Sequence, residues 1–194
     1  MNIVLLGLFG SGKSTLAQEL SKKLDMQIVS SSMTKEYIAS KKDGYEAIQR
    51  YKSAGKELPE IYAEKIFLDR YSDVKDGLII DNVYTIQRLQ TVLKHLNIDN
   101  YIYLDVDVET AINRVRKRGR EDFNEDFIKG RLHLFNKNID LIKKLLGDKL
   151  KTYDANVPVK ELHEQIFTDM NIKGNNKLRK TVKPNATKFS VSKS

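Results

Sequence analysis

The sequence contains no cysteine among its 194 residues. Neither a disulfide framework nor a thiolate zinc site can therefore form, and a reducing, cytosolic setting fits this composition. Long apolar runs are missing at the start of the chain, where Ile3 to Leu8 is far too short to cross a bilayer. This run also lacks the basic flank and the small-residue cleavage site of a signal peptide. We therefore expect a cytoplasmic protein without a membrane partner.

Acidic residues are missing from the C-terminal tail. The chain has 34 Lys and Arg against 26 Asp and Glu, a net charge of +8. Seven of the basic residues lie in residues 171–194, so residues 1–170 are nearly neutral, with 27 basic against 26 acidic side chains. The tail has few large apolar side chains to offset its ordering entropy, and we expect it to be disordered. It is either a solubilising extension or a weak contact for nucleic acid.

Apolar runs alternate with helical periodicities over residues 1–170, which predicts one α/β domain around a parallel sheet. Strands are expected where short, continuous apolar runs occur, and helices where apolar residues recur every three or four positions. The expected strands cover 3–6, 27–29, 77–81, 101–106 and 150–153. The expected helices cover 14–24, 85–96, 108–118, 127–146 and 159–170.

A glycine-rich loop follows the first expected strand and precedes the first expected helix. Its letters, GLFGSGKS, satisfy the pattern G-x-x-x-x-G-K-[ST], which binds the phosphates of nucleoside triphosphates. Glycines let backbone N–H groups approach phosphate oxygens, and the helix N-terminus adds its positive dipole end. Lys13 is expected to reach the β and γ phosphates of ATP. The candidate ATP-binding residues are Gly7, Gly10, Ser11, Gly12, Lys13, Ser14 and Thr15.

A carboxylate at the end of a neighbouring strand is the usual partner of such a loop in holding Mg²⁺. Asp81 closes the strand Leu78-Ile79-Ile80 and is the candidate for this role, acting through water, with the Ser14 hydroxyl as the direct ligand. Asp105, which ends the following strand, is a competitor. Either residue could instead only cap the turn that follows it.

Five arginines crowd the region after the fourth expected strand. Guanidinium groups stabilise the charge of a transferring phosphoryl group better than lysine does, although such a run can also be a solvated helix face. The five are Arg114, Arg116, Arg118, Arg120 and Arg131.

The loop GLFGSGKST, the strand GLIID and the segment RVRKRGRED…GRL together resemble the adenylate kinase family of nucleoside monophosphate kinases. The resemblance covers residues 1–170 and implies a three-layer P-loop fold. It implies a helical acceptor-binding part near residues 31–72 and a short lid near 117–123, without a zinc-binding insertion. It also implies that Arg114 lies against the adenine and Arg118 on the ATP phosphates, that Arg120 and Arg131 clamp the transferring group, and that Asp122 is the acidic residue between them.

The acceptor side of the family pattern matches poorly. The family signature Asp-Gly-Phe-Pro-Arg-Thr stands here as DNVYTI, so the arginine that should hold the acceptor phosphate is missing, and a second arginine motif is absent as well. Lys35, Arg50 or Arg88 could replace the missing charges. The segment GKELPE, with Leu58, is similar to the one that frames the acceptor base. Further candidates for contacting that base are Gln87 and Gln90.

The implied activity is transfer of the ATP γ-phosphoryl to AMP or a related ribo- or deoxynucleoside monophosphate, by a monomer that uses Mg²⁺. One alternative is a P-loop kinase for a non-nucleotide acceptor. Another is a catalytically weak nucleotide-binding protein that acts through its basic tail. His95, His133 and His163 have no metal spacing, so we expect them at the surface or at interfaces.

Overall fold

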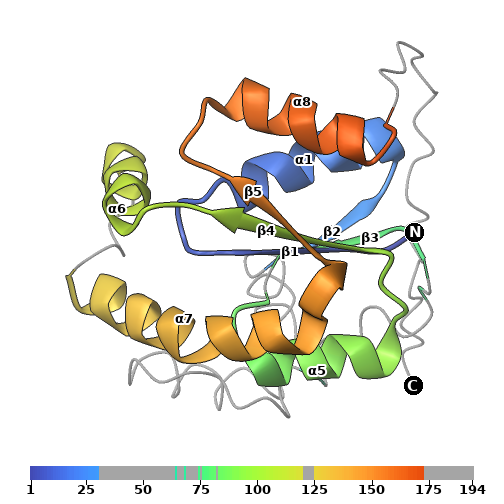
Figure 1. Ribbon diagram of the computed structural model, residues 1–194, viewed down its shortest axis with the longest axis horizontal. Coiled ribbons are helices and arrows are strands. Elements are labelled where there is room, and N and C mark those ends of the chain that lie inside the picture. The colour runs from blue at the N-terminus through green and yellow to red at the C-terminus, as the bar shows by residue number, and fades with distance from the viewer. Residues whose placement is uncertain are drawn as a thin grey trace, which may run out of the picture.

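A five-stranded, all-parallel sheet with the order β2-β3-β1-β4-β5 forms the centre of the protein (Figure 1). The computed structural model describes residues 1–30, 64, 68, 74, 76–81, 83–119 and 125–172, apart from the side chains of residues 126 and 127. Its strands are β1 (Ile3–Gly7), β2 (Gln27–Val29), β3 (Leu78–Ile80), β4 (Asn100–Asp105) and β5 (Leu150–Asp154). Its helices are α1 (Lys13–Leu24), α5 (Ile86–His95), α6 (Val108–Lys117), α7 (Glu125–Leu146), the 3-10 turn η1 (Gly147–Lys149) and α8 (Val159–Asp169).

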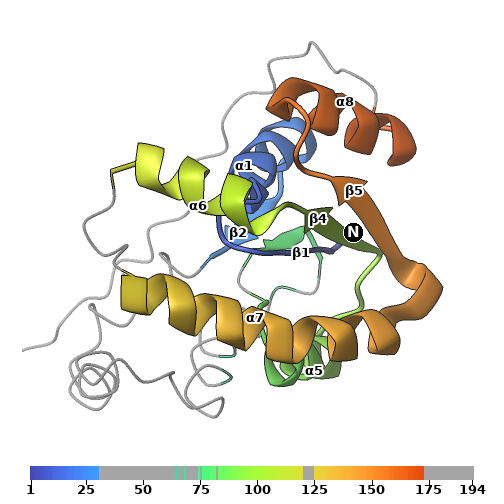
Figure 2. The same cartoon turned by 60° about the vertical axis from the view of Figure 1, so that its left-hand side comes forward.

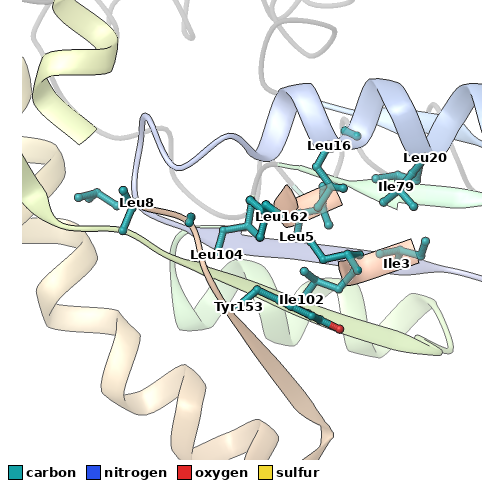
Figure 3. Packing of buried hydrophobic residues seen from close by; sticks show 14 of the residues in the cluster. Ile3, Leu5, Leu8, Leu16, Leu20, Ile79, Ile102, Leu104, Tyr153 and Leu162 are labelled. Carbon is teal, nitrogen blue, oxygen red and sulfur yellow. The ribbon is translucent and has the colours of Figure 1, made fainter. Parts of the chain in front are cut away.

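Helices cover both faces of the sheet, α1 and α8 on one and α5 and α7 on the other (Figures 1 and 2). Successive strand side chains point to opposite faces, and both sets are apolar. Ile3 and Leu5 join the cluster under α1 and α8, shown in Figure 3, whereas Val4 and Leu6 join the cluster under α5 and α7. Each such fully buried side chain contributes roughly 1.5–3 kcal/mol. The strands therefore need continuous apolar runs, as the sequence predicted.

The predicted α/β class is confirmed, and the elements begin and end close to their predicted positions. The helix predicted over 85–96 is α5, where Thr85 is the N-cap residue and its hydroxyl oxygen accepts a hydrogen bond from the Arg88 N–H at 3.1 Å. Thr is favoured at this position because it satisfies an N–H without an intrahelical partner. The capping threonine and the apolar spacing both indicated a helix here, and the folded protein has that helix.

The sheet order places β1 between β3 and β4, so the loop after β1 lies between the ends of its two neighbours. Ile3 pairs with Ile79 of β3 and with Asn100 of β4. All strands run in one direction, and their carboxyl ends share one edge of the sheet. This edge is where ligands bind in open α/β sheets.

One histidine departs from the expectation of a surface or interface position. His163 is only 7% exposed, on the side of α8 that packs toward the sheet. Its ring lies 5.8 Å from that of Phe167, and Lys23 of α1 lies over the Phe167 ring at 4.9 Å. Burial lowers the pKa of His163, while the carboxylate of Glu19 acts in the opposite direction.

Three predicted segments fall wholly or mostly outside the described residues. They are the acceptor-binding part near 31–72, the lid near 117–123 and the tail 171–194. Within the part of the chain that is described, no helix is long and apolar enough to cross a membrane.

Candidate active site

The glycine-rich loop leaves β1 at Gly7 and enters α1 at Lys13. Gly10 has a φ of 72°, and a Cβ placed on it would stand 2.4 Å from the carbonyl oxygen of Ala111 in α6. Gly12 is the N-cap of α1 with a φ of 100°, and a Cβ there would meet nothing within 4 Å. The loop thus needs glycine at position 10 for close packing and at position 12 for its left-handed backbone. The open side at Gly12 adjoins the positive end of α1, where an anion is favoured.

The Lys13 ammonium lies along this loop. Nζ donates hydrogen bonds to the carbonyl oxygens of Gly7 at 2.8 Å and Leu8 at 2.7 Å, and it lies 3.4 Å from the Ser11 hydroxyl oxygen. Burial lowers the pKa of Lys13 to about 8, because a desolvated ammonium is less stable than a solvated one. Asp81 opposes this shift.

The Asp81 carboxylate meets the beginning of α1. Ser14 donates its hydroxyl to Asp81 Oδ2 at 2.7 Å. Asp81 is 8% exposed, and its Oδ1 accepts no hydrogen bond from any residue that the structure describes. Burial raises the pKa of Asp81, and the Lys13 charge and the Ser14 hydrogen bond oppose that shift. Asp105, the competitor at the end of β4, is exposed and accepts a hydrogen bond from the Tyr103 hydroxyl instead.

Two predicted arginines bring positive charge to Lys13 from different helices. Arg118 is the C-cap residue of α6, and Arg131 lies on the second turn of α7. Both charges lower the pKa of Lys13. Arg114 instead joins the loop to the segment after β5, since its Nη1 donates to the Ala155 carbonyl at 2.8 Å and lies 3.5 Å from the Gly10 carbonyl oxygen.

The described acceptor candidates differ in exposure. Arg88, on the first turn of α5, is 8% exposed, whereas Gln87 and Gln90 on the same helix are exposed to solvent. The remaining predicted site residues lie outside the described part of the chain: Lys35, Arg50, Leu58, Arg120 and Asp122.

Sequence reasoning missed two contacts of α7, one with the first residue of α5 and one with the β3–α5 connection. Asn138 is buried on α7, where its Oδ1 accepts from the Ile86 N–H at 3.0 Å and its Nδ2 donates to the Leu134 carbonyl at 2.8 Å. The guanidinium carbon of Arg131 lies 4.8 Å from the centre of the Tyr84 ring. The signal for Asn138 was present in the sequence, as a polar residue on the inward face of an amphipathic helix. The sequence carries no comparable signal for the contact between Tyr84 and Arg131.

A parallel sheet with β1 at its centre, a glycine loop closing on Lys13 and a strand-end Asp81 bonded to Ser14 define a P-loop protein. The family model described as an AAA domain matches residues 6–129. The chain is 33% identical over 165 residues to the adenylate kinase of Mycolicibacterium vanbaalenii, which covers 80% of this chain and 91% of that relative. It is 31% identical over 180 residues to the adenylate kinase of Corynebacterium aurimucosum, covering 88% and 99%.

The chain belongs to the adenylate kinase family of nucleoside monophosphate kinases, and it is a nucleotide kinase. A solved structure of deoxyadenosine kinase from M. mycoides with bound dCTP shares the fold, with a TM-score of 0.55 and 24% identity over 88% of this chain and 99% of that one. The family model and the two relatives at 33% and 31% identity confirm the predicted family.

Proposed function

We propose that this kinase transfers the γ-phosphoryl group of ATP to a nucleoside monophosphate, AMP or a related ribo- or deoxynucleotide. The observation that carries the proposal is the geometry of the P-loop, where Lys13 lies along the loop carbonyls and Ser14 donates to the buried Asp81. Arg118 and Arg131 add positive charge that acts on Lys13. Phosphoryl transfer needs positioning and charge stabilisation more than covalent chemistry, and this set of side chains supplies both.

In the proposed reaction the acceptor phosphate oxygen attacks the γ-phosphorus in line as the bond to the β–γ bridging oxygen breaks. Lys13 exchanges its hydrogen bonds with the loop carbonyls for contacts with the β and γ phosphates. Arg118 and Arg131, with Arg120 between them in the sequence, neutralise charge on the transferring group. Arg114 would lie beside the adenine, and Asp122 is the acidic residue between Arg120 and Arg131 in the sequence. Closure of residues 117–123 over ATP excludes water and limits hydrolysis.

The residues around Ser14 fit a divalent cation. The Ser14 hydroxyl is a direct ligand of the kind that Mg²⁺ takes in P-loops, and Asp81 Oδ1 is a buried carboxylate oxygen that accepts no hydrogen bond from the described residues. Ser14 would hold the ion directly and Asp81 would hold its water shell. Bound there with ATP, Mg²⁺ would neutralise charge on the β and γ phosphates.

Arg88 is the best-supported replacement for the missing acceptor arginine. The family's arginine position, four residues after Asp81, is Thr85, whose hydroxyl caps α5. Arg88 and His95 are seven residues apart and therefore lie on one face of α5. The His95 Nε2 is 2.9 Å from Glu64 Oε1, so this face looks toward the segment expected to bind the acceptor. Arg88 is at the end of that face nearer to Asp81.

The other residues proposed to bind the acceptor have smaller roles. Gln87 and Gln90 are exposed and could reach the acceptor base only from the outer side of α5. Lys35 and Leu58 belong to the proposed acceptor-binding part near 31–72, with Lys35 adding charge and Leu58 framing the base. The basic tail after residue 170 is assigned no part in transfer, and it is either a solubilising extension or a weak contact for nucleic acid.

The test is ATP consumption in the presence of Mg²⁺ against a panel of ribo- and deoxynucleoside monophosphates, with the diphosphate products resolved. Adenosine and deoxyadenosine serve as acceptors without a phosphate. We expect diphosphate formation from one or a few monophosphates and its loss in Lys13→Ala. The matched control Lys22→Ala removes an exposed lysine of the same helix and should retain activity. ATP binding without transfer to any monophosphate would contradict the proposal.

A further inference from the structure

The Tyr84 ring and the Arg131 guanidinium form a contact between the β3–α5 connection and α7. The guanidinium carbon lies 4.8 Å from the ring centre, within the range of cation–π attraction. Tyr84 follows Asp81 by three residues and is half-buried. The contact therefore joins the segment that carries the candidate metal carboxylate to the helix that carries a candidate catalytic arginine.

A second contact, two residues after Tyr84, joins α7 to the first residue of α5. The Asn138 Oδ1 accepts from the Ile86 N–H, and Asn138 is 5% exposed. Arg131 and Asn138 are seven residues apart, or two turns on one face of α7. The Ile86 N–H is one of the donors at the start of α5 without an intrahelical partner, so this hydrogen bond sets the position of α7 against the connection. The Asn138 hydrogen bond thus fixes the backbone of α7, the helix whose Arg131 side chain contacts the Tyr84 ring.

An aromatic ring restrains arginine in a way that suits phosphate chemistry. The face of an aromatic ring attracts a guanidinium without neutralising its positive charge. Arg131 lies on the second turn of α7, and its charge acts electrostatically on Lys13 of the P-loop. Arginine side chains have many rotamers, and a restrained one loses less conformational entropy when it meets the transferring group.

We propose that Tyr84 is a positioning residue for the reaction, holding Arg131 toward the transferring phosphoryl group. The inference rests on the proposed function. Tyr84 lies in the stretch where the family signature has its proline and arginine, and it would act through the distant Arg131 rather than on the acceptor phosphate. The hydroxyl is not required for this role, because the attraction comes from the ring face.

The test compares Tyr84→Phe with Tyr84→Leu, each in the wild-type background and in Arg131→Ala. We expect Tyr84→Phe to keep kcat within about twofold, since the ring is preserved, and Tyr84→Leu to lower kcat by about 5- to 30-fold, the range of a cation–π contact. The KM for ATP should not change. In Arg131→Ala, Tyr84→Leu should have no further effect on kcat, because the residue it positions is gone.

Three outcomes would overturn the inference while wild-type transfer is intact: full kcat in Tyr84→Leu, an equal loss in Tyr84→Phe, or a loss that persists in Arg131→Ala. If the loss of kcat persists in Arg131→Ala and the KM for the acceptor is raised, the ring contacts the acceptor itself. Urea unfolding of the four variants of the cycle separates folding effects from positioning, since additive losses of stability would contradict the Tyr84–Arg131 contact. Absence of transfer in the wild type would instead contradict the proposed function, and the proposed role of Tyr84 would fail with it.

Discussion

Ser14 at the beginning of α1 donates its hydroxyl to Asp81 just beyond β3, across 2.7 Å. The contact joins two segments far apart in the sequence, and it does so at the edge of the sheet where the P-loop lies. Lys13, the neighbour of Ser14, is the cation that opposes the raised pKa of the Asp81 carboxyl group. The metal chemistry proposed for Ser14 and the charge of Lys13 are therefore linked through one carboxylate.

Asp81→Asn tests this link through the Mg²⁺ requirement. Asparagine keeps the shape and still accepts the Ser14 hydrogen bond, but it lacks the charge that holds a metal's water shell. We expect the Mg²⁺ concentration for half-maximal transfer to rise by about tenfold or more. Asp105→Asn is the matched control, because Asp105 also ends a strand but is exposed and bonded to Tyr103. An equal Mg²⁺ dependence in both variants would contradict the role of Asp81.

Lys13 predicts a pH dependence of ATP binding. Its pKa in the protein is about 8, and ATP phosphates favour the charged form. Below pH 8 the ammonium is already present. As the pH rises above 8, binding must take up a proton, so the apparent Kd for ATP should rise by up to tenfold per pH unit.

Isothermal titration at pH 7.0, 8.5 and 9.0 in buffers of different ionisation enthalpy measures both the Kd and the proton uptake. Lys13→Arg is the comparison variant, since its guanidinium stays charged over this range and should show no proton uptake. In Asp81→Asn the rise in Kd should begin at lower pH, because Asp81 raises the pKa of Lys13. A constant wild-type Kd from pH 7 to 9 would count against the low pKa.

Arg88→Met tests the acceptor assignment. Methionine keeps an apolar stem in the buried site and removes the guanidinium. We expect the acceptor KM to rise by roughly 10- to 150-fold, the cost of about 1.5–3 kcal/mol for one charge-assisted hydrogen bond, while the KM for ATP stays the same. Arg88→Lys should recover part of the loss, and Gln87→Met on the exposed side of α5 should show none. Unfolding curves must accompany the kinetics, because Arg88 is buried.

His163 predicts a loss of stability in acid. Burial lowers the pKa of His163 below its ordinary value of 6.5. The unfolded chain therefore binds more protons than the folded one as the pH falls through 6.5, and the free energy of unfolding decreases there. The difference in this free energy between pH 7.5 and pH 5.0 should be smaller in His163→Gln than in the wild type. His133→Gln, at an exposed position, should keep the wild-type difference.

Local patterns predicted most of the fold and the position of the glycine-rich loop between β1 and α1. The short apolar run Leu78-Ile79-Ile80 favoured a buried strand, and the spacing from Gly7 to Ser14 is typical of a loop between a strand and a helix. The sequence did not predict that His163 is buried, because the apolar residues of α8 mark only the middle of the face that this helix buries. That face is wider, since α8 packs on the sheet and also lies near Glu19 and Lys23 of α1.

The rest of the site depends on contacts between distant segments. Nothing near Tyr84 in the sequence indicates that Arg131 lies against its ring, and nothing near Asn138 indicates that it bonds to the Ile86 N–H. Such pairs follow from how α7 crosses the β3–α5 connection, which sequence periodicity does not specify. The family resemblance did not supply them either, because the signature differs in this stretch.

The central place of β1 in the sheet has a consequence for how the protein is made. This strand is synthesised before both of its partners, β3 and β4, whose residues Ile79 and Asn100 lie beside Ile3. Parallel pairing between such distant segments forms slowly. Because synthesis proceeds at about 5–20 residues per second, the apolar run from Ile3 to Leu6 is without its neighbouring strands for roughly several seconds. During that interval the nascent chain exposes a strand of apolar residues, a segment of the kind that chaperones bind.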